Sequence, residues 1–179
     1  MERSEPRKFV LDDFNRPVLK ELYLYVTGHK SFKGSLHKGI HLWGYYGTGK
    51  TSILQALTEI ISETTPKIIE MINAKEFGKK LLERGMVHYS KKPLFIDDLG
   101  RETEEIKDYG NVTKPVPDLY YLRKENGSWT FQTCQYSLTE PWDKTKDPPP
   151  LIKKYGIFTV DRMIASFNEI ELKGKSRRS

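Results

Sequence analysis

The chain has 179 residues, of which 37% are hydrophobic and 30% charged. This length suits one domain with a sizeable core and argues against a second independent domain. No apolar run is long enough to span a membrane, and the first ten residues are too polar for a signal peptide. The single cysteine excludes an internal disulfide. We therefore expect a cytoplasmic protein without a membrane partner. The formal net charge of +6 is compatible with nucleic-acid binding or with an ordinary solvated surface.

The first 38 residues are predicted to be a linker and one helix that precede the core. Residues 1–17 are polar apart from one apolar cluster, which we expect to dock on the core: Phe9, Val10, Leu11 and Phe14. Apolar residues at helical spacing then predict a helix over 17–26, and a basic loop that contains glycine follows over 30–38.

From residue 39 onwards, strands are predicted to alternate with helices. Short apolar runs predict five strands, at 40–43, 68–72, 93–98, 129–133 and 169–172. Helical periodicity predicts helices at 51–62, 74–85, 119–126, 151–155 and 160–167. This alternation predicts an α/β fold in which one five-stranded parallel sheet carries helices on both faces, with a core that spans residues 39–179. The charged residues 100–117 are expected to form a solvated loop.

The stretch Gly-Tyr-Tyr-Gly-Thr-Gly-Lys-Thr at 44–51 has the spacing of a phosphate-binding loop between a strand and a helix. Its glycines permit backbone angles that let successive N–H groups face a phosphate chain. Lys50 supplies a compact positive charge, the Thr51 hydroxyl can coordinate magnesium, and the following helix directs the positive end of its dipole at the same anion. The stretch predicts a nucleoside triphosphate site formed by Gly44, Tyr45, Tyr46, Gly47, Thr48, Gly49, Lys50, Thr51 and Ser52.

A second informative stretch runs from Pro93 to Asp98, where an apolar run ends in two aspartates. A buried parallel strand presents carboxylates in this way at the carboxyl edge of an open α/β sheet, where ligands bind. The signal is weak by itself, but it lies one strand and one helix beyond the phosphate loop. We therefore expect Asp97 to hold a magnesium ion, directly or through water, and Asp98 to polarise the attacking water.

Together these stretches resemble the AAA+ ATPases, and within them the DnaC/IstB-type clade of bacterial and phage helicase loaders and transposition helper ATPases. The Asp-Asp-Leu-Gly ending at 97–100 and the closing Gly-x-Ser-Arg-Arg at 174–178 are more particular to this clade than the phosphate loop is. The resemblance covers residues 38–178 and implies a three-layer P-loop NTPase fold with a small or absent lid subdomain, and ATP and Mg²⁺ as cofactors. The clade inserts an extra helix after its second strand, whereas residues 73–92 have room for one helix and a short loop.

Further roles follow from the resemblance, position by position. Gln135 lies where the family has its sensor 1 asparagine, which orients the lytic water, and it keeps the amide on a longer arm. The family's finger arginine, which a neighbouring subunit inserts to stabilise transition-state charge, corresponds to Phe158 here. Arg162 is the next basic residue, and it either acts in trans or pairs with a carboxylate. Arg177 or Arg178 resembles a sensor 2 arginine, or, as an exposed tail residue, binds nucleic acid or nothing.

The function that the resemblance implies is that of an ATP-binding and ATP-hydrolysing factor in DNA replication, a helicase-loader-like protein that binds single-stranded DNA. We expect a homo-oligomer in the ATP-bound state, slow hydrolysis that depends on assembly, and a replicative helicase as partner. Three lysines of the helix predicted at 74–85 would contact DNA phosphates or simply form a solvated face: Lys75, Lys79 and Lys80. Three alternatives remain open: a transposition helper that works with a transposase, a nucleotide-dependent adaptor with negligible hydrolysis, and a small-molecule phosphotransferase.

Overall fold

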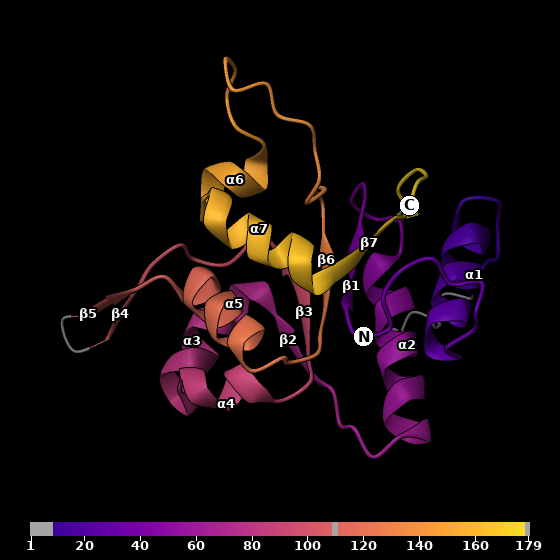
Figure 1. Ribbon diagram of the computed structural model, residues 1–179, viewed down its shortest axis with the longest axis horizontal. Helices are drawn as coiled ribbons and strands as arrows, with labels where there is room; N and C mark the ends of the chain where they lie inside the picture. Colours follow the sequence, from indigo (N-terminus) through magenta and orange to yellow (C-terminus); the bar gives the residue numbers. More distant parts are fainter. Residues whose placement is uncertain (1–8, 109–110, 178–179) are drawn as a thin grey trace, which may run out of the picture.

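A five-stranded parallel sheet forms the middle layer of the computed structural model, which describes residues 9–108 and 111–177 (Figure 1). The strands are β1 (Gly39–Trp43), β2 (Glu70–Asn73), β3 (Leu94–Leu99), β6 (Thr130–Cys134) and β7 (Phe167–Glu171). Their order across the sheet is β2-β3-β6-β1-β7, and every neighbouring pair is parallel. The predicted five-stranded parallel sheet is therefore confirmed, and each predicted strand lies within two residues of its observed position.

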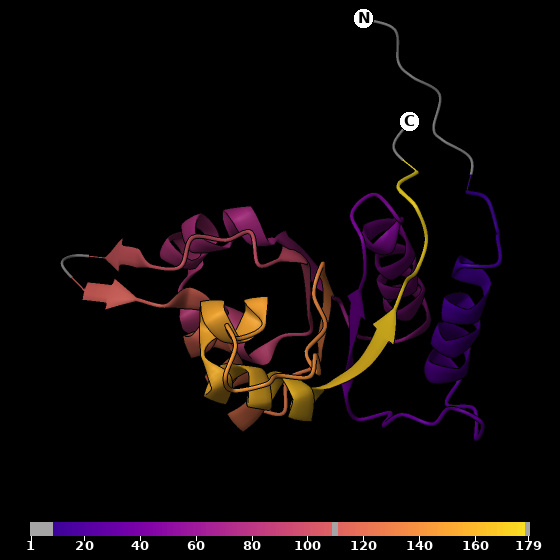
Figure 2. The ribbon, with the colours of Figure 1, turned by 90° about the horizontal axis from the view of Figure 1, so that it is seen from above.

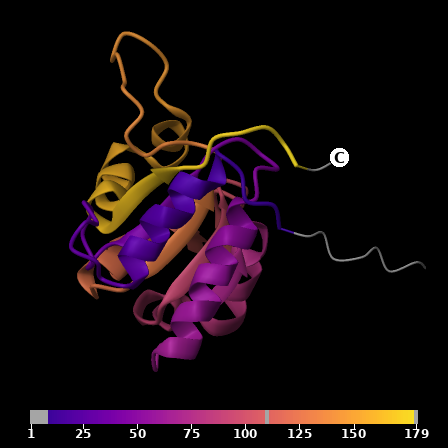
Figure 3. The ribbon, with the colours of Figure 1, turned by 90° about the vertical axis from the view of Figure 1, so that its right-hand side faces the viewer.

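Helices cover both faces of this sheet (Figure 2). One face carries α1 (Asn15–Val26) and α2 (Lys50–Thr64), which lie side by side in Figure 3. The other face carries five helices: α3 (Ala74–Arg84), α4 (Met86–Lys91), α5 (Pro115–Glu125), α6 (Pro150–Tyr155) and α7 (Ile157–Ser166). None of the helices in the described ranges is long and apolar enough to cross a membrane.

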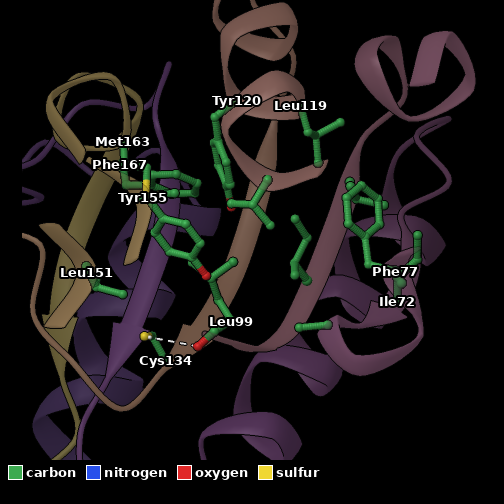
Figure 4. Close-up of a cluster of buried hydrophobic side chains, with 14 of the residues drawn as sticks. Ile72, Phe77, Leu99, Leu119, Tyr120, Cys134, Leu151, Tyr155, Met163 and Phe167 are labelled. Atoms are coloured by element: carbon green, nitrogen blue, oxygen red, sulfur yellow. Dashed lines mark hydrogen bonds between the residues drawn. The ribbon is translucent and has the colours of Figure 1, made fainter. Parts of the chain in front are cut away.

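The strands are apolar on both sides because each side packs against a helical layer. In β3 the side chain of Phe95 joins the cluster under α1 and α2, whereas Leu94 and Ile96 join the larger cluster on the opposite face. Figure 4 shows this larger cluster, in which the Cys134 thiol lies 3.3 Å from the carbonyl oxygen of Leu99. Burial on both faces is typical of parallel sheets, and it explains why these strands read as continuous apolar runs in the sequence.

The expectation of one helix and a short loop after the second strand was wrong. Two helices, α3 and α4, follow β2 and are separated by Gly85, whose φ of 79° ends α3. Six residues are too few for helical periodicity to stand out, which is why the sequence did not reveal α4. It is nevertheless anchored in the core, because Tyr89 is buried against Phe77 of α3.

Residues 100–117 do not form a plain solvated loop either. They contain an antiparallel hairpin of β4 (Ile106–Asp108) and β5 (Asn111–Thr113), which projects from the helical layer in Figure 2. Helix α5 begins at Pro115 rather than near Leu119, because proline suits the first turn of a helix, where its missing N–H is not needed. Glu102 is buried in this segment, which its charged neighbours in the sequence did not suggest.

The predicted docking of the N-terminal apolar cluster on the core was also wrong. The exposed fractions are 54% for Phe9, 66% for Val10, 48% for Leu11 and 54% for Phe14. Helix α1 makes the contact with the core instead, through its buried residues Val18, Leu22 and Tyr25. At the other end, residues 172–177, the last that the structure describes, form no helix.

Candidate nucleotide site

Most of the residues predicted to bind nucleotide meet at the carboxyl edge of the sheet, where β1, β3 and β6 end. A cleft of about 640 Å³ lies there. Its lining includes nine predicted residues: Tyr46, Gly47, Gly49, Lys50, Thr51, Ser52, Asp98, Gln135 and Arg177. The prediction missed four further lining residues: Phe9, Val10, Asp12 and Arg101.

The phosphate loop joins β1 to α2 in the predicted way. Gly47 has a φ of 74°, and Gly49, at the N-cap of α2, has a φ of 98°. Both values lie in the left-handed region that favours glycine, so the expectation of special backbone angles is confirmed. The first turn of the 15-residue helix α2 therefore opens at the cleft, where its N–H groups and its dipole favour an anion.

Lys50 is held within its own loop. Its Nζ donates to the carbonyl oxygens of Gly44, at 2.9 Å, and of Tyr45, at 2.8 Å, and the residue is only 6% exposed. A buried ammonium group is costly without hydrogen-bond partners, and these carbonyl oxygens supply them. The positive charge is thus placed at the cleft before any anion enters.

Three residues of the predicted loop shape it without lining the cleft. A Cβ on Gly44 would lie 2.2 Å from the carbonyl oxygen of Leu172, so only glycine fits there. Thr48 is buried and its hydroxyl donates to the carbonyl oxygen of Tyr45 at 2.9 Å. The Tyr45 ring is largely exposed and lies 4.0 Å, between centroids, from the ring of Tyr46.

Thr51 and Asp97 are brought together as a metal site requires. The Thr51 hydroxyl donates to Asp97 Oδ1 at 2.8 Å, and the Thr133 hydroxyl donates to the same oxygen at 2.7 Å. In the described ranges no group of three or more His, Cys, Asp or Glu residues could hold a metal. Mg²⁺ is commonly bound by one or two protein oxygens together with phosphates and water, so a hydroxyl beside a carboxylate fits it.

Asp98 lies at an irregularity in β3. The register with β6 shifts between Ile96 and Leu99, and Asp98 is the one non-glycine residue with a positive φ, 58°, in the described parts of the chain. Its N–H donates to the Thr133 hydroxyl at 2.8 Å, and its Oδ2 accepts from Arg101 Nη1 at 3.2 Å. Such bulges re-aim side chains beside functional sites, and here Asp98 faces the cleft while Asp97 faces Thr51.

A buried network supports the turn that carries Arg101. The Gly100 N–H donates to a Glu102 carboxylate oxygen at 2.9 Å, and the Tyr155 hydroxyl donates to the other oxygen. Lys154 Nζ donates to the Gly100 carbonyl oxygen at 2.9 Å and lies 3.4 Å from the Glu102 carboxylate. Burial, and then the Glu102 charge, raise the pKa of Tyr155. Helix α6 thus fixes the segment that follows the two aspartates.

The loop that carries Gln135 is fixed by a chain of three hydrogen bonds, two of them buried and the third partly buried. The Tyr120 hydroxyl donates to Gln132 Oε1, the Gln132 amide donates to His41 Nδ1 at 2.6 Å, and His41 Nε2 donates to the Tyr136 carbonyl oxygen at 2.9 Å. This arrangement needs a neutral imidazole, because Nδ1 must accept. Burial lowers the pKa of His41 to about 4. His41 is therefore packed, as the sequence suggested, and it positions the segment beside the cleft.

We predict that this histidine makes stability fall in mild acid. In the unfolded chain His41 binds a proton below its ordinary pKa of about 6.5, whereas the folded chain resists protonation down to about pH 4. The free energy of unfolding should therefore be lower at pH 4.5 than at pH 7.5, with about 2–3 kcal/mol of the loss due to this one group. Urea denaturation of the wild type and of His41→Gln at both pH values measures it.

The His41→Gln variant should lose that part of the pH dependence, because glutamine does not titrate. His37→Gln, which changes an exposed histidine, is the matched control and should keep it. Equal pH dependence in the wild type and in His41→Gln would contradict the prediction.

The two arginines that the resemblance singled out have different positions. Arg162 lies on α7 outside the cleft, with its guanidinium 5.2 Å from the ring centroid of Tyr121 and its Nη1 3.4 Å from the carbonyl oxygen of Phe158. Phe158 itself is 79% exposed. A residue that acts in trans must lie outside its own chain's cleft, so this position leaves the trans role open.

Arg177, by contrast, reaches the cleft of its own chain. Its N–H donates to the Gly47 carbonyl oxygen at 2.8 Å, and its Nη2 donates to Asp12 Oδ2 at 2.6 Å. Hydrogen bonds from the backbone N–H groups of Asn15 and Phe14, together with the charge of Arg177, hold the pKa of Asp12 below its usual value. Arg178 lies outside the described residues.

Comparisons with known proteins bear on the fold. No protein-family model and no curated protein sequence matches the chain. Among solved structures, the DnaC helicase loader matches with a TM-score of 0.66 and 20% identity over 93% of this chain and 94% of that chain. DnaI matches with a TM-score of 0.67 and 20% identity over 96% of this chain and 88% of that chain.

A third solved structure, AMPPCP-bound DnaA from Aquifex aeolicus, matches with a TM-score of 0.62 and 17% identity. The match covers 92% of this chain and 48% of the DnaA chain. At these identities the likeness shows the fold. The chain shares its three-layer α/β fold with the solved DnaC and DnaI structures, so the resemblance found in the sequence is confirmed at the level of the fold.

Proposed function

We propose that the chain is an AAA+ protein that binds and hydrolyses ATP and acts in DNA replication in the manner of a helicase loader. The observation that carries the proposal is the contact between Thr51 and Asp97 beside the buried Lys50, because it unites two sequence-distant motifs into one triphosphate site. The fold shared with the DnaC helicase loader supports the role in replication. The related DnaA fold holds AMPPCP, an analogue of ATP, which supports the choice of nucleotide.

Several residues of the chain would bind the phosphates of ATP and its metal ion. Lys50 exchanges its loop carbonyl partners for phosphate oxygens, and the N–H groups at the start of α2 bind the same anion. Thr51 and Asp97 hold Mg²⁺, which when bound neutralises charge on the phosphates. Arg177, already at the cleft, lies where it can contact the nucleotide.

The residues that act in hydrolysis lie at the ends of β3 and β6. Asp98 polarises the attacking water and Gln135 orients it, since both line the cleft at the ends of neighbouring strands. Arg101 competes with that water for Asp98, which supports slow hydrolysis in the isolated chain. Assembly into an ATP-bound homo-oligomer then adds charge from a neighbour, for which Arg162 is the candidate.

The proposed partners are a replicative helicase and single-stranded DNA. The DNA contact predicted for α3 is weakened by its own acids, because Lys79 lies 3.9 Å from Glu83 and Lys80 lies 3.9 Å from Glu76. Such pairs are typical of a solvated helix face. A transposition helper that works with a transposase would use the same core residues.

A second candidate function is a nucleotide-dependent adaptor that binds ATP but hydrolyses it negligibly. The ion pair between Arg101 and Asp98 favours it, because it occupies the carboxylate that should act on water. The exposed Phe158, at the position of the family's finger arginine, favours it as well.

ATP turnover at rising protein concentration, with and without single-stranded DNA, tests both functions. A loader-like ATPase completed by its neighbour should show a specific activity that rises with concentration and with DNA. A low and flat specific activity together with tight ATP binding would identify the adaptor. Failure to bind ATP at all would contradict both functions.

A further inference from the structure

The edge of the sheet opposite the nucleotide cleft has a basic surface that the proposed ATP hydrolysis does not use. Four connections lead into the amino ends of β1, β2, β3 and β6, namely residues 27–38, 65–69, 92–93 and 126–129. They hold two histidines, no aspartate or glutamate, and five lysines: Lys30, Lys33, Lys38, Lys67 and Lys92. We call this the amino-edge surface. These five lysines carry five positive charges, and the net charge of the whole chain is +6, so the rest of the chain is nearly neutral.

The parallel sheet forces these connections to one side. Hydrogen bonds at the strand starts link them, from Leu94 N–H to the Trp129 carbonyl oxygen at 3.1 Å and from Glu70 N–H to the Pro93 carbonyl oxygen at 3.2 Å. In Figure 1 the connection from α2 to β2 runs along the lower edge of the molecule, whereas the yellow segment that follows β7 lies above the sheet. A ligand on the amino-edge surface would therefore leave the nucleotide cleft open.

The lysines of this surface are available to a ligand. Lys30, Lys33, Lys67 and Lys92 are exposed, and within the described ranges none of the four makes an ion pair with a carboxylate, unlike Lys79 and Lys80 of α3. Lys38 is half-buried and donates to the carbonyl oxygen of Ile164. The last two residues of each adjoining helix include two lysines and two glutamates, namely Lys91, Lys124, Glu63 and Glu125. Their charges cancel, so the net positive charge of the amino-edge surface is unchanged.

An aromatic pocket opens among these connections. It has a volume of about 420 Å³, and its lining includes Tyr25, His37, Lys67 and Trp129. The Trp129 ring is held in place, because its Nε1 donates to the Tyr25 hydroxyl at 2.7 Å and that hydroxyl donates to the Lys38 carbonyl oxygen at 2.8 Å. Lys67 Nζ lies 4.4 Å from the centroid of the Trp129 ring, which places a cation beside the aromatic wall.

We propose that the amino-edge surface binds single-stranded nucleic acid, with phosphates on the lysines and a base in the pocket beside Trp129. A run of lysines without acids suits a uniformly charged phosphate chain, and aromatic side chains accept bases that are free of a duplex. An acidic protein segment would be attracted by the same charge, but it offers no planar ring for the pocket. This site is distinct from the α3 lysines, and its sequence preference should be weak, because phosphate contacts carry no sequence information.

Fluorescence anisotropy of a labelled oligothymidylate tests the proposal in the full chain. A triple variant, Lys30→Glu, Lys33→Glu and Lys67→Glu, should weaken binding by at least roughly 10-fold. The slope of the logarithm of the binding constant against the logarithm of the salt concentration should become less steep by about 2. The matched control reverses three exposed lysines elsewhere, Lys107→Glu, Lys144→Glu and Lys153→Glu, and makes the same change in net charge. This control should retain most of the affinity and the wild-type salt dependence.

Other results would overturn the proposal. One is an equal loss of oligothymidylate affinity in the two triple variants, and another is a loss of affinity confined to Lys75→Glu on α3. A third is competition by polyglutamate that is as strong as competition by unlabelled oligothymidylate of equal charge. The last result would identify an acidic protein segment as the ligand. Replacing the three lysines by Gln repeats the test if charge reversal prevents folding. ATP binding, measured beside each titration, should be unchanged, so failure of this site is distinguishable from failure of the proposed ATPase.

Discussion

Lys50→Ala is expected to weaken ATP binding and to reduce turnover by roughly 10²-fold or more, the scale seen when one preorganised donor to a developing charge is removed. Lys50 brings a buried positive charge to the cleft, and its hydrogen bonds to Gly44 and Tyr45 also hold the loop together. Calorimetric titration with ATP and a phosphate-release assay measure the two effects separately.

The matched control for this experiment is Lys75→Ala, which removes an exposed lysine outside the cleft and should leave ATP binding intact. Thermal unfolding of both variants shows whether the loop change has damaged the fold. Turnover that survives Lys50→Ala in a folded protein would falsify the proposed site.

Arg123→Ala is expected to have the largest effect on stability, lowering the free energy of unfolding by about 3–5 kcal/mol. Arg123 of α5 is 2% exposed, and its guanidinium donates to four partners on α4 and beside the starts of β3 and β6: the carbonyl oxygens of Tyr89, Lys92 and Trp129 and the hydroxyl of Thr130. Removing it leaves these acceptors buried beside a cavity. Burial already lowers the pKa of Arg123 to about 10, so the guanidinium remains charged at neutral pH.

Urea denaturation measures this loss, with Arg16→Ala as the control because Arg16 is exposed. Arg123→Lys should recover only part of the loss, since an ammonium group cannot reproduce the planar fork of donors. A destabilisation below about 1 kcal/mol in Arg123→Ala, the level of an ordinary surface substitution, would show that the acceptors find other partners.

The elements that the sequence predicted correctly are those whose signal is local. The strand and phosphate loop before Lys50 carry an apolar run and a fixed glycine spacing, and the strand before Asp97 ends in paired acids, so local patterns place both. The parallel order of the strands follows from their alternation with helices. These features were sufficient to predict that the two motifs share one edge.

The missed features depend on contacts between distant residues. In the sequence Glu102 is one of several charged residues in a polar loop. Only its contacts with Tyr155 and Lys154 of α6 show that it holds this loop in place. Asp12 and Arg177 pair across 165 positions, which no local pattern reveals. Arg101 lies near the paired acids in the sequence, but its ion pair with Asp98 requires the positive φ of that aspartate and the bulge in β3.

The pairing of Asp12 with Arg177 has a practical consequence for experiments. Because Ser176 and Arg177 lie against Gly47, and Phe9, Val10 and Asp12 line the same cleft, both ends of the described chain converge on the nucleotide site. A fluorophore attached near either end would therefore report on nucleotide exchange, and a bulky purification tag placed there would disturb it. A silent attachment point belongs at the exposed Lys107 of the β4–β5 hairpin, because in Figure 2 this hairpin projects on the opposite side of the sheet from the yellow segment that follows β7.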